Sequence, residues 1–212
     1  MKKKRPAKRF SLNYANIITL SRVVLAPIIA GSFFLDAFGW PIFTARIVSL
    51  VLIVIAELTD MFDGMAARAM KSVSDTGKVF DPFADSFYRF SIFAAFTALG
   101  YLPLWMLLVF FYRDSLVSVV RTLSGLKGTA MAARISGKVK AVVQAAGTFI
   151  VILVDLVRYN PFGNIADQAR TFIPYESIIF WTFALITVYT AYSAVDYLAG
   201  SYKVWGKGFL RR

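Results

Sequence analysis

Four aspartates, arranged in two pairs, are the residues of this chain best suited to chemistry. Asp60 and Asp63 are three residues apart, and Asp81 and Asp85 are four apart. Residues at these spacings share one face of a helix, so two helices would each present a pair of carboxylates. Apolar sequence precedes the first pair and follows the second. Because carboxylates at membrane depth are costly and usually functional, the two pairs predict a site.

Four carboxylates on two facing helices would repel one another and lose hydration, and bound cations would relieve both costs. Oxygen ligands select hard ions, which favours Mg²⁺ or Mn²⁺ over Ca²⁺. Zinc is disfavoured because the sequence contains no cysteine and no histidine. Two-metal sites suit phosphoryl chemistry, since they stabilise both the attacking and the leaving oxygen. We therefore expect two divalent cations, Mg²⁺ or Mn²⁺.

Two glycines and an arginine extend this predicted site. Gly64 follows Asp60 by four residues, and Gly77 precedes Asp81 by four. A helical glycine costs roughly 1 kcal/mol relative to alanine. The missing side chains would open a slot for a flat base or a diphosphate, although close helix packing is the alternative explanation. Arg68, one turn beyond Gly64, is placed to hold a phosphate oxygen, unless it only sets membrane topology.

Six apolar segments must carry these residues. The chain of 212 residues is 58% hydrophobic and 17% charged, with a mean hydropathy of +0.63, whereas soluble domains are about half apolar and a quarter charged. Each segment has about the 20 residues that span a bilayer. The sequence predicts an all-α, polytopic membrane protein with six transmembrane helices, over residues 17–35, 42–62, 83–100, 103–121, 137–157 and 176–198. Pro82 predicts a bend or an irregularity near the start of the third helix.

Basic residues near the segment ends predict the orientation. The chain begins with a basic run at residues 2–9, and among the end-flanking bases only Arg46, Arg158 and Arg170 would fall on the opposite side. Both termini are therefore expected in the cytoplasm. We divide the chain into a basic segment (1–15), a six-helix domain (16–200) and a basic tail (201–212). The net charge of +12 fits a membrane surface or an anionic substrate; nucleic acid is not expected, since no motif for it is present.

The aspartates, glycines and Arg68 together form one pattern, with Ala67 as a further member. The pattern Asp60-x2-Asp63-Gly64-x2-Ala67-Arg68-x8-Gly77-x3-Asp81-x3-Asp85 resembles the signature of the CDP-alcohol phosphotransferases. This resemblance implies a six-helix enzyme, a homodimer, with a polar cavity open to the cytoplasm. It also implies residence in a bacterial inner membrane, among membrane lipids.

The resemblance further implies a reaction and a role for each residue. An acceptor hydroxyl would attack the lipid-linked phosphate of a CDP-alcohol and release CMP. The implied metal ligands are Asp60, Asp63, Asp81 and Asp85, and the implied CDP-binding residues are Asp60, Gly64, Ala67, Arg68, Gly77 and Asp81. Asp85 would be a metal ligand or the general base. The composition is consistent with a carboxylate base, because a chain without histidine must use another group for proton transfer. Direct displacement is expected because no activated nucleophile is apparent.

Two further stretches concern the acceptor, and both resemble the phosphatidylglycerophosphate synthase branch of that family. The first places Asn16, Thr19 and Arg22 along one side of the first helix. The second is Arg113-Asp114-x6-Arg121, followed by Gly137-Lys138-Val139-Lys140-x3-Gln144. We expect the phosphate of an acceptor such as glycerol 3-phosphate to meet four cations, Arg113, Arg121, Lys138 and Lys140.

The immediate neighbour of Arg113 is an acid. Asp114 is adjacent in sequence, so the two side chains are expected on different faces of the helix. Ser86 stands where that branch carries lysine, which leaves inositol phosphate or serine open as the acceptor. A cation channel or transporter is the alternative of another class; it predicts aspartates spread through the membrane depth, whereas these cluster near one face.

Overall fold

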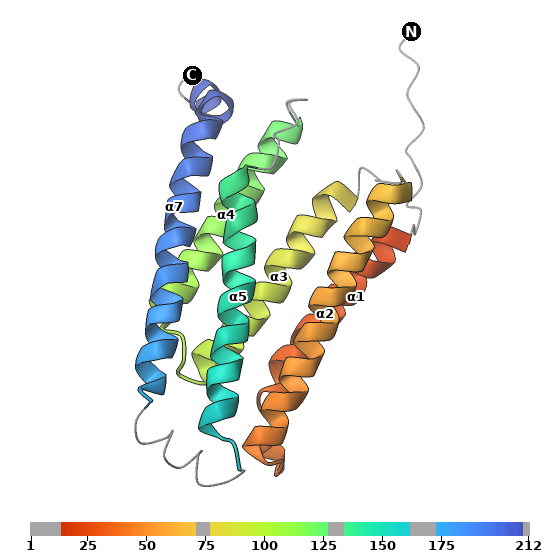
Figure 1. Cartoon of the computed structure of the whole chain (residues 1–212). Helices are drawn as coiled ribbons and strands as arrows, with labels where there is room; N and C mark the ends of the chain where they lie inside the picture. Colours follow the sequence, from red (N-terminus) through yellow and green to blue (C-terminus); the bar gives the residue numbers. More distant parts are fainter. Residues whose placement is uncertain (1–13, 71–76, 127–133, 162–172, 210–212) are drawn as a thin grey trace.

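The structure, a computed structural model, describes residues 14–70, 77–126, 134–161 and 173–209, and it gives no side-chain description for 14–19, 60–70, 77–82, 123, 125–126 and 203–209. Helices make up nearly all of these residues (Figure 1). They are α1 (Tyr14–Ser32), η1 (Leu35–Phe38), α2 (Ile42–Met70), α3 (Gly77–Ala98), α4 (Leu104–Leu126), α5 (Ile135–Arg158) and α7 (Tyr175–Phe209).

The six long helices coincide with the six predicted segments, which confirms the all-α prediction. Within the described residues, three stretches are long and apolar enough to cross a membrane, Ile42–Thr59, Ile135–Arg158 and Tyr175–Tyr202. Three helices continue several residues past their predicted ends, since α2 runs to Met70, α4 runs to Leu126 and α7 runs to Phe209. α3 is helical from Gly77 onwards, so Pro82 leaves the helix uninterrupted; a proline near a helix start is better tolerated than one in its interior.

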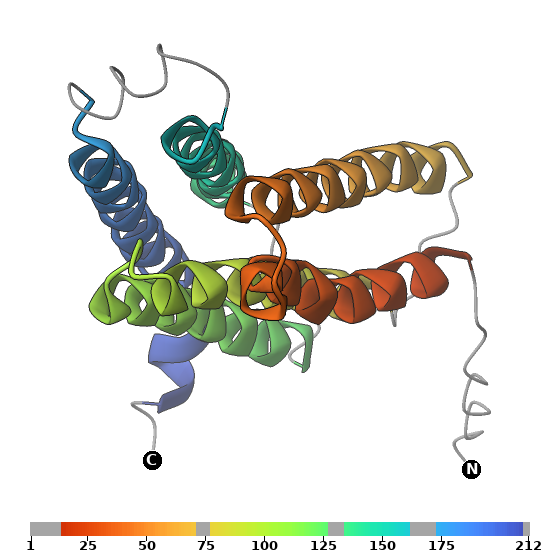
Figure 2. The ribbon, with the colours of Figure 1, turned by 90° about the horizontal axis from the view of Figure 1, so that it is seen from below.

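Successive helices run in opposite directions, so two ends of the bundle can be distinguished (Figure 1). At the signature end lie the end of α2 and the start of α3, together with the start of α1 and the end of α7. The opposite end holds η1 and the connection between α3 and α4. α1 packs against α2 and α3, α7 packs against α4 and α5, and further contacts join α3 to α4 and α2 to α5 (Figure 2).

An aromatic cluster joins these helices in the core. The ring of Phe93 lies 5.0 Å from that of Phe110 and 6.0 Å from that of Phe183, between centroids. Phe96 lies 5.6 Å from Phe183 and 5.2 Å from Phe33. These separations are typical of attractive aromatic pairs. The cluster therefore fixes α1, α3, α4 and α7 relative to one another.

A short turn connects α3 and α4, as the sequence predicts for a tight antiparallel pair. Gly100 has a φ of +79°, a backbone conformation that glycine adopts without steric cost. The backbone N–H of Tyr101 donates to the carbonyl of Phe96 at 2.9 Å, which satisfies an end carbonyl of α3. This turn places the Tyr101 side chain at the opposite end of the bundle.

Candidate active site

The signature residues lie on the two helices that the sequence predicts for them. Asp60, Asp63, Gly64, Ala67 and Arg68 belong to the C-terminal part of α2, and Gly77, Asp81 and Asp85 belong to the start of α3. Both stretches are at the signature end (Figure 1). Except for Asp85, their side chains are outside the described part of the structure, so their convergence remains a prediction. The same holds for Asn16 and Thr19, whereas Arg22 on α1 is described and half-buried.

The donor set of the signature consists of carboxylate oxygens, which fits Mg²⁺ or Mn²⁺. Among the side chains that the structure describes, no three acidic residues come together as a metal site. Three of the four predicted ligands, however, are not among those side chains. The metal site therefore stays a prediction that rests on helix placement and ligand chemistry.

Asp85 is held by an arginine that the sequence analysis missed. Arg89 Nε donates to Asp85 Oδ1 at 3.2 Å, and Arg89 Nη1 donates to the carbonyl of Ala141 at 3.0 Å. Asp85 and Arg89 are one helical turn apart on α3, a spacing that favours ion pairs, so the sequence did contain this signal. Arg89 thus links the last signature aspartate to α5.

Arg113 and Lys140, two of the predicted acceptor-binding cations, meet at one carboxylate oxygen. Asp114 Oδ1 accepts a hydrogen bond from Arg113 Nη1 at 2.8 Å and one from Lys140 Nζ at 2.6 Å. The expectation that Arg113 and Asp114 point to different faces is wrong, because the long arginine side chain folds back to its neighbour. We call these three residues the acceptor network.

The acceptor network is held in place by α7 and by a glycine. Arg113 Nε donates to Ser193 Oγ on α7 at 3.0 Å. A Cβ atom on Gly137 would lie 3.4 Å from Arg113 Nη2, so the glycine leaves room for the guanidinium. Arg113 and Lys140 are both buried. Two buried cations that share one carboxylate leave a positive charge uncompensated within the network, which favours an anionic ligand.

The other two predicted acceptor residues do not join the acceptor network in the described contacts. The Arg121 guanidinium lies 6.0 Å from the centre of the Tyr197 ring, over its face. Lys138 is exposed. Their placement supports a cation–π contact for Arg121 and a solvent-facing role for Lys138. The structure thus brings together Arg113 and Lys140 and leaves Arg121 and Lys138 outside.

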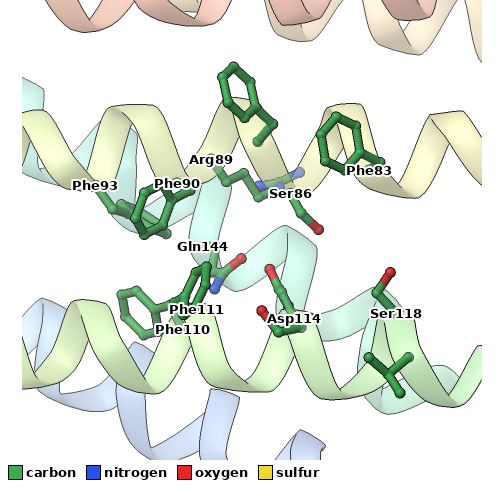
Figure 3. Close-up of a pocket in the computed structure, with 13 residues that line it drawn as sticks. Phe83, Ser86, Arg89, Phe90, Phe93, Phe110, Phe111, Asp114, Ser118 and Gln144 are labelled. Carbon is green, nitrogen blue, oxygen red and sulfur yellow. The ribbon is translucent and has the colours of Figure 1, made fainter.

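A pocket of about 360 Å³ lies between α3 and α4, next to the acceptor network (Figure 3). Its aromatic wall is formed by phenylalanines on both helices, including Phe83, Phe90 and Phe111. Its polar lining includes Arg89, Asp114 and Gln144, together with three serines. The pocket therefore connects the arginine that holds Asp85 with the carboxylate that holds the two acceptor cations.

A second buried ion pair lies at the opposite end. Arg46 Nε donates to Asp155 Oδ2 at 2.5 Å, and Tyr101 Oη donates to Asp155 Oδ1 at 2.5 Å. Arg46 also donates to the carbonyl of Phe33. Burial, together with the hydrogen bond to Asp155, raises the pKa of the Tyr101 phenol, so the hydroxyl stays protonated and donates. We call Arg46, Asp155 and Tyr101 the closed network.

Known proteins are similar to this chain in sequence. The model of the CDP-alcohol phosphatidyltransferase family matches residues 12–195. A CDP-diacylglycerol–glycerol-3-phosphate 3-phosphatidyltransferase of Bacillus subtilis is 28% identical over 184 residues, covering 83% of this chain and 90% of the relative. One of the same name from Rickettsia felis is 28% identical over 185 residues, covering 87% and 94%. A probable phosphatidylglycerophosphate synthase of Mycobacterium tuberculosis is 33% identical over 141 residues, covering 66% of each. The chain belongs to the CDP-alcohol phosphatidyltransferase family.

Proposed function

We propose that this chain transfers a phosphatidyl group from CDP-diacylglycerol to glycerol 3-phosphate, which yields phosphatidylglycerophosphate and CMP. Family membership supports the chemistry, and the names of the relatives support both substrates. The observation that carries the choice of acceptor is the acceptor network. Arg113 and Lys140 share one oxygen of Asp114, and a phosphate monoester would supply the negative charge that this network lacks.

The reaction is a displacement at phosphorus. A primary hydroxyl oxygen of glycerol 3-phosphate forms a bond to the phosphorus that carries the diacylglycerol. The bond from that phosphorus to the CMP oxygen breaks, and CMP leaves with the electron pair. The proton of the attacking hydroxyl passes to a carboxylate, for which Asp85 is the candidate.

Arg89 prepares Asp85 for this role. The guanidinium donates to Asp85 from the same helix and is itself anchored on the carbonyl of Ala141 in α5. A charge-assisted hydrogen bond of this kind fixes the carboxylate in one orientation. α5 also carries Lys140, which is proposed to bind the phosphate of the acceptor alcohol. The contact of Arg89 with Ala141 therefore fixes the position of Asp85, the candidate proton acceptor, relative to Lys140.

The signature residues would hold the donor. Asp60, Asp63, Asp81 and Asp85 would ligate the divalent cations, and Gly64, Ala67, Arg68 and Gly77 would line the CDP moiety. Bound Mg²⁺ or Mn²⁺ would neutralise charge on the attacking and leaving oxygens. The chain's own contribution is to present oxygen ligands from α2 and α3 at one end of the bundle.

The setting of the reaction is a membrane. The excess of basic residues at the signature end favours a cytoplasmic position for that end and for both termini. There the site would receive soluble glycerol 3-phosphate from one side and CDP-diacylglycerol from the bilayer. A bacterial inner membrane and a homodimer are part of this proposal.

The test is a reconstitution of the reaction with purified protein, CDP-diacylglycerol and Mg²⁺. Glycerol 3-phosphate, inositol phosphate and serine are supplied separately, and both CMP and the lipid product are identified by mass spectrometry. We expect CMP and phosphatidylglycerophosphate with glycerol 3-phosphate. A product with inositol phosphate or serine alone would assign a different acceptor, and no CMP with any alcohol would favour a channel or transporter.

A further inference from the structure

The amide of Gln144 has a buried oxygen with no hydrogen-bond partner among the described residues. The residue is 1% exposed, and it lines the pocket between α3 and α4 (Figure 3). A buried acceptor without a donor is costly, and such groups in native proteins are usually satisfied by a ligand or by water. Gln144 Oε1 therefore marks the position in the pocket where a hydrogen-bond donor of a ligand would be satisfied.

Gln144 is placed beside the acceptor network. It follows Lys140 by one helical turn on α5, so the two side chains share a face. Asp114, whose Oδ1 accepts from Lys140 Nζ at 2.6 Å, lines the same pocket. A small molecule whose phosphate binds Arg113 and Lys140 would thus have its remaining polar groups within reach of the amide.

We infer that Gln144 recognises the hydroxyl of the acceptor that does not react, the secondary hydroxyl of glycerol 3-phosphate. This inference rests on the proposed function and names the group that selects the alcohol. The hydroxyl donates to Gln144 Oε1, while Arg113 and Lys140 hold the phosphate. Gln144 is thus a specificity-determining residue, and the primary hydroxyl remains available for attack.

The burial of Gln144 strengthens this recognition. The side chain is 1% exposed, and phenylalanines such as Phe90 and Phe111 line the same pocket. Hydrogen bonds in such a low-dielectric place are strong, and unpaired groups there are expensive. A site built to bond a substrate hydroxyl rejects an analogue that lacks it, because the protein group is then left unpaired. Ordered water is the competing occupant, since a water molecule takes about 30 Å³ of liquid volume and therefore fits in the pocket.

A two-by-two experiment separates these occupants. Wild type and Gln144→Met are assayed with glycerol 3-phosphate and with 3-hydroxypropyl phosphate, which keeps the phosphate and the primary hydroxyl but lacks the secondary one. For wild type we expect kcat/KM to fall roughly 10- to 100-fold with the analogue. For Gln144→Met we expect a similar loss with glycerol 3-phosphate and no further loss with the analogue. Thr148→Val, one turn further along α5, is the matched control and should discriminate as wild type does.

Several results would overturn the inference. If Gln144→Met still discriminates between the two acceptors as wild type does, the amide does not read the hydroxyl. If wild type itself uses both acceptors within twofold, the inference fails without any variant, so a misfolded Gln144→Met does not protect it. A wild type that forms CMP with inositol phosphate but not with glycerol 3-phosphate would instead refute the proposed function. Thermal unfolding checks the fold, and we expect Gln144→Met to be at least as stable as wild type because it removes an unpaired polar group.

Discussion

The two buried charge networks of this bundle differ in how completely their charges are matched. In the closed network, both oxygens of Asp155 accept hydrogen bonds, and the Arg46 and Asp155 side chains are 3% and 2% exposed. In the acceptor network, two cations share a single oxygen of Asp114 beside a pocket, and a nearby amide oxygen has no partner among the described residues. Removing one partner of a matched buried pair leaves an unpaired buried charge and destabilises the fold, whereas a local excess of charge within a membrane protein indicates a ligand.

This difference predicts that substitutions at the signature end reduce enzymatic activity more than they reduce the stability of the fold. Asp81→Asn, which removes a predicted metal ligand, should lower turnover by more than about 100-fold, since outer-shell changes alone cost about 10- to 100-fold. Membrane insertion should be unchanged. Activity is measured as CMP release at saturating Mg²⁺, with folding followed by size-exclusion chromatography. Retained turnover would remove Asp81 from the metal site.

Substitutions in the closed network should mainly reduce the stability of the fold. Arg46→Met leaves the Asp155 carboxylate buried, with Tyr101 as its one remaining donor among the described residues, so the free energy of unfolding should fall by about 3–5 kcal/mol. The double variant Arg46→Met/Asp155→Leu should be less destabilised than Arg46→Met, because no charge is left unpaired. Thermal unfolding in detergent measures both. Equal stability of Arg46→Met and wild type would show that this pair does not hold the fold.

The acceptor network should respond through substrate affinity. Lys140→Met removes one charge-assisted bond to the acceptor phosphate, so KM for glycerol 3-phosphate should rise roughly 10- to 100-fold while KM for CDP-diacylglycerol stays the same. Lys138→Met, at an exposed position outside the network, should raise KM for glycerol 3-phosphate less than about fivefold. Steady-state kinetics with each substrate varied in turn decide the matter. An equal rise in both KM values for Lys140→Met would contradict acceptor binding.

The arginine between the two sites gives a smaller effect. Arg89→Lys keeps the positive charge near Asp85 but cannot make both of the contacts that Arg89 makes with Asp85 and Ala141. We expect kcat to fall about tenfold, the equivalent of one hydrogen bond, with little change in either KM. Arg89→Leu should lose more activity than Arg89→Lys. If the two variants are equally active, Arg89 does not act through its charge.

An exposed ion pair provides the smallest effect and a reference for the closed network. Arg158 Nη2 lies 3.4 Å from Glu176 Oε1, and the glutamate side chain is 85% exposed. Pairs of this kind contribute about 0–1 kcal/mol, so Arg158→Gln should barely change the melting temperature. Raising the salt concentration should affect wild type and Arg158→Gln alike. A loss as large as that of Arg46→Met would mean that burial does not distinguish the two pairs.

Much of the helical fold could be predicted from local patterns. Long apolar runs predicted the six helices, and the glycine at position 100 fits the predicted tight turn between α3 and α4. The spacing of the signature placed its residues on α2 and α3. These features depend on neighbours in sequence, which is why a single chain reveals them.

The charge networks depend on contacts that no local pattern contains. Arg46 and Asp155 are 109 residues apart, and the sequence indicated only that Arg46 flanks a segment. Because Asp114 is adjacent to Arg113 in sequence, an ion pair between them was not expected, although the length of an arginine side chain permits the contact. The ion pair of Asp85 with Arg89 was visible as a one-turn spacing, but its anchor on Ala141 depends on where α5 lies relative to α3.

Comparing glycerol 3-phosphate with glycerol as acceptors tests the central claim most directly, because the two alcohols differ only in the phosphate that the acceptor network is proposed to bind. CMP release by the purified protein is measured with CDP-diacylglycerol, Mg²⁺ and each alcohol at the same concentration. The account predicts rapid release with glycerol 3-phosphate and almost none with glycerol. Comparable release with both alcohols would contradict it.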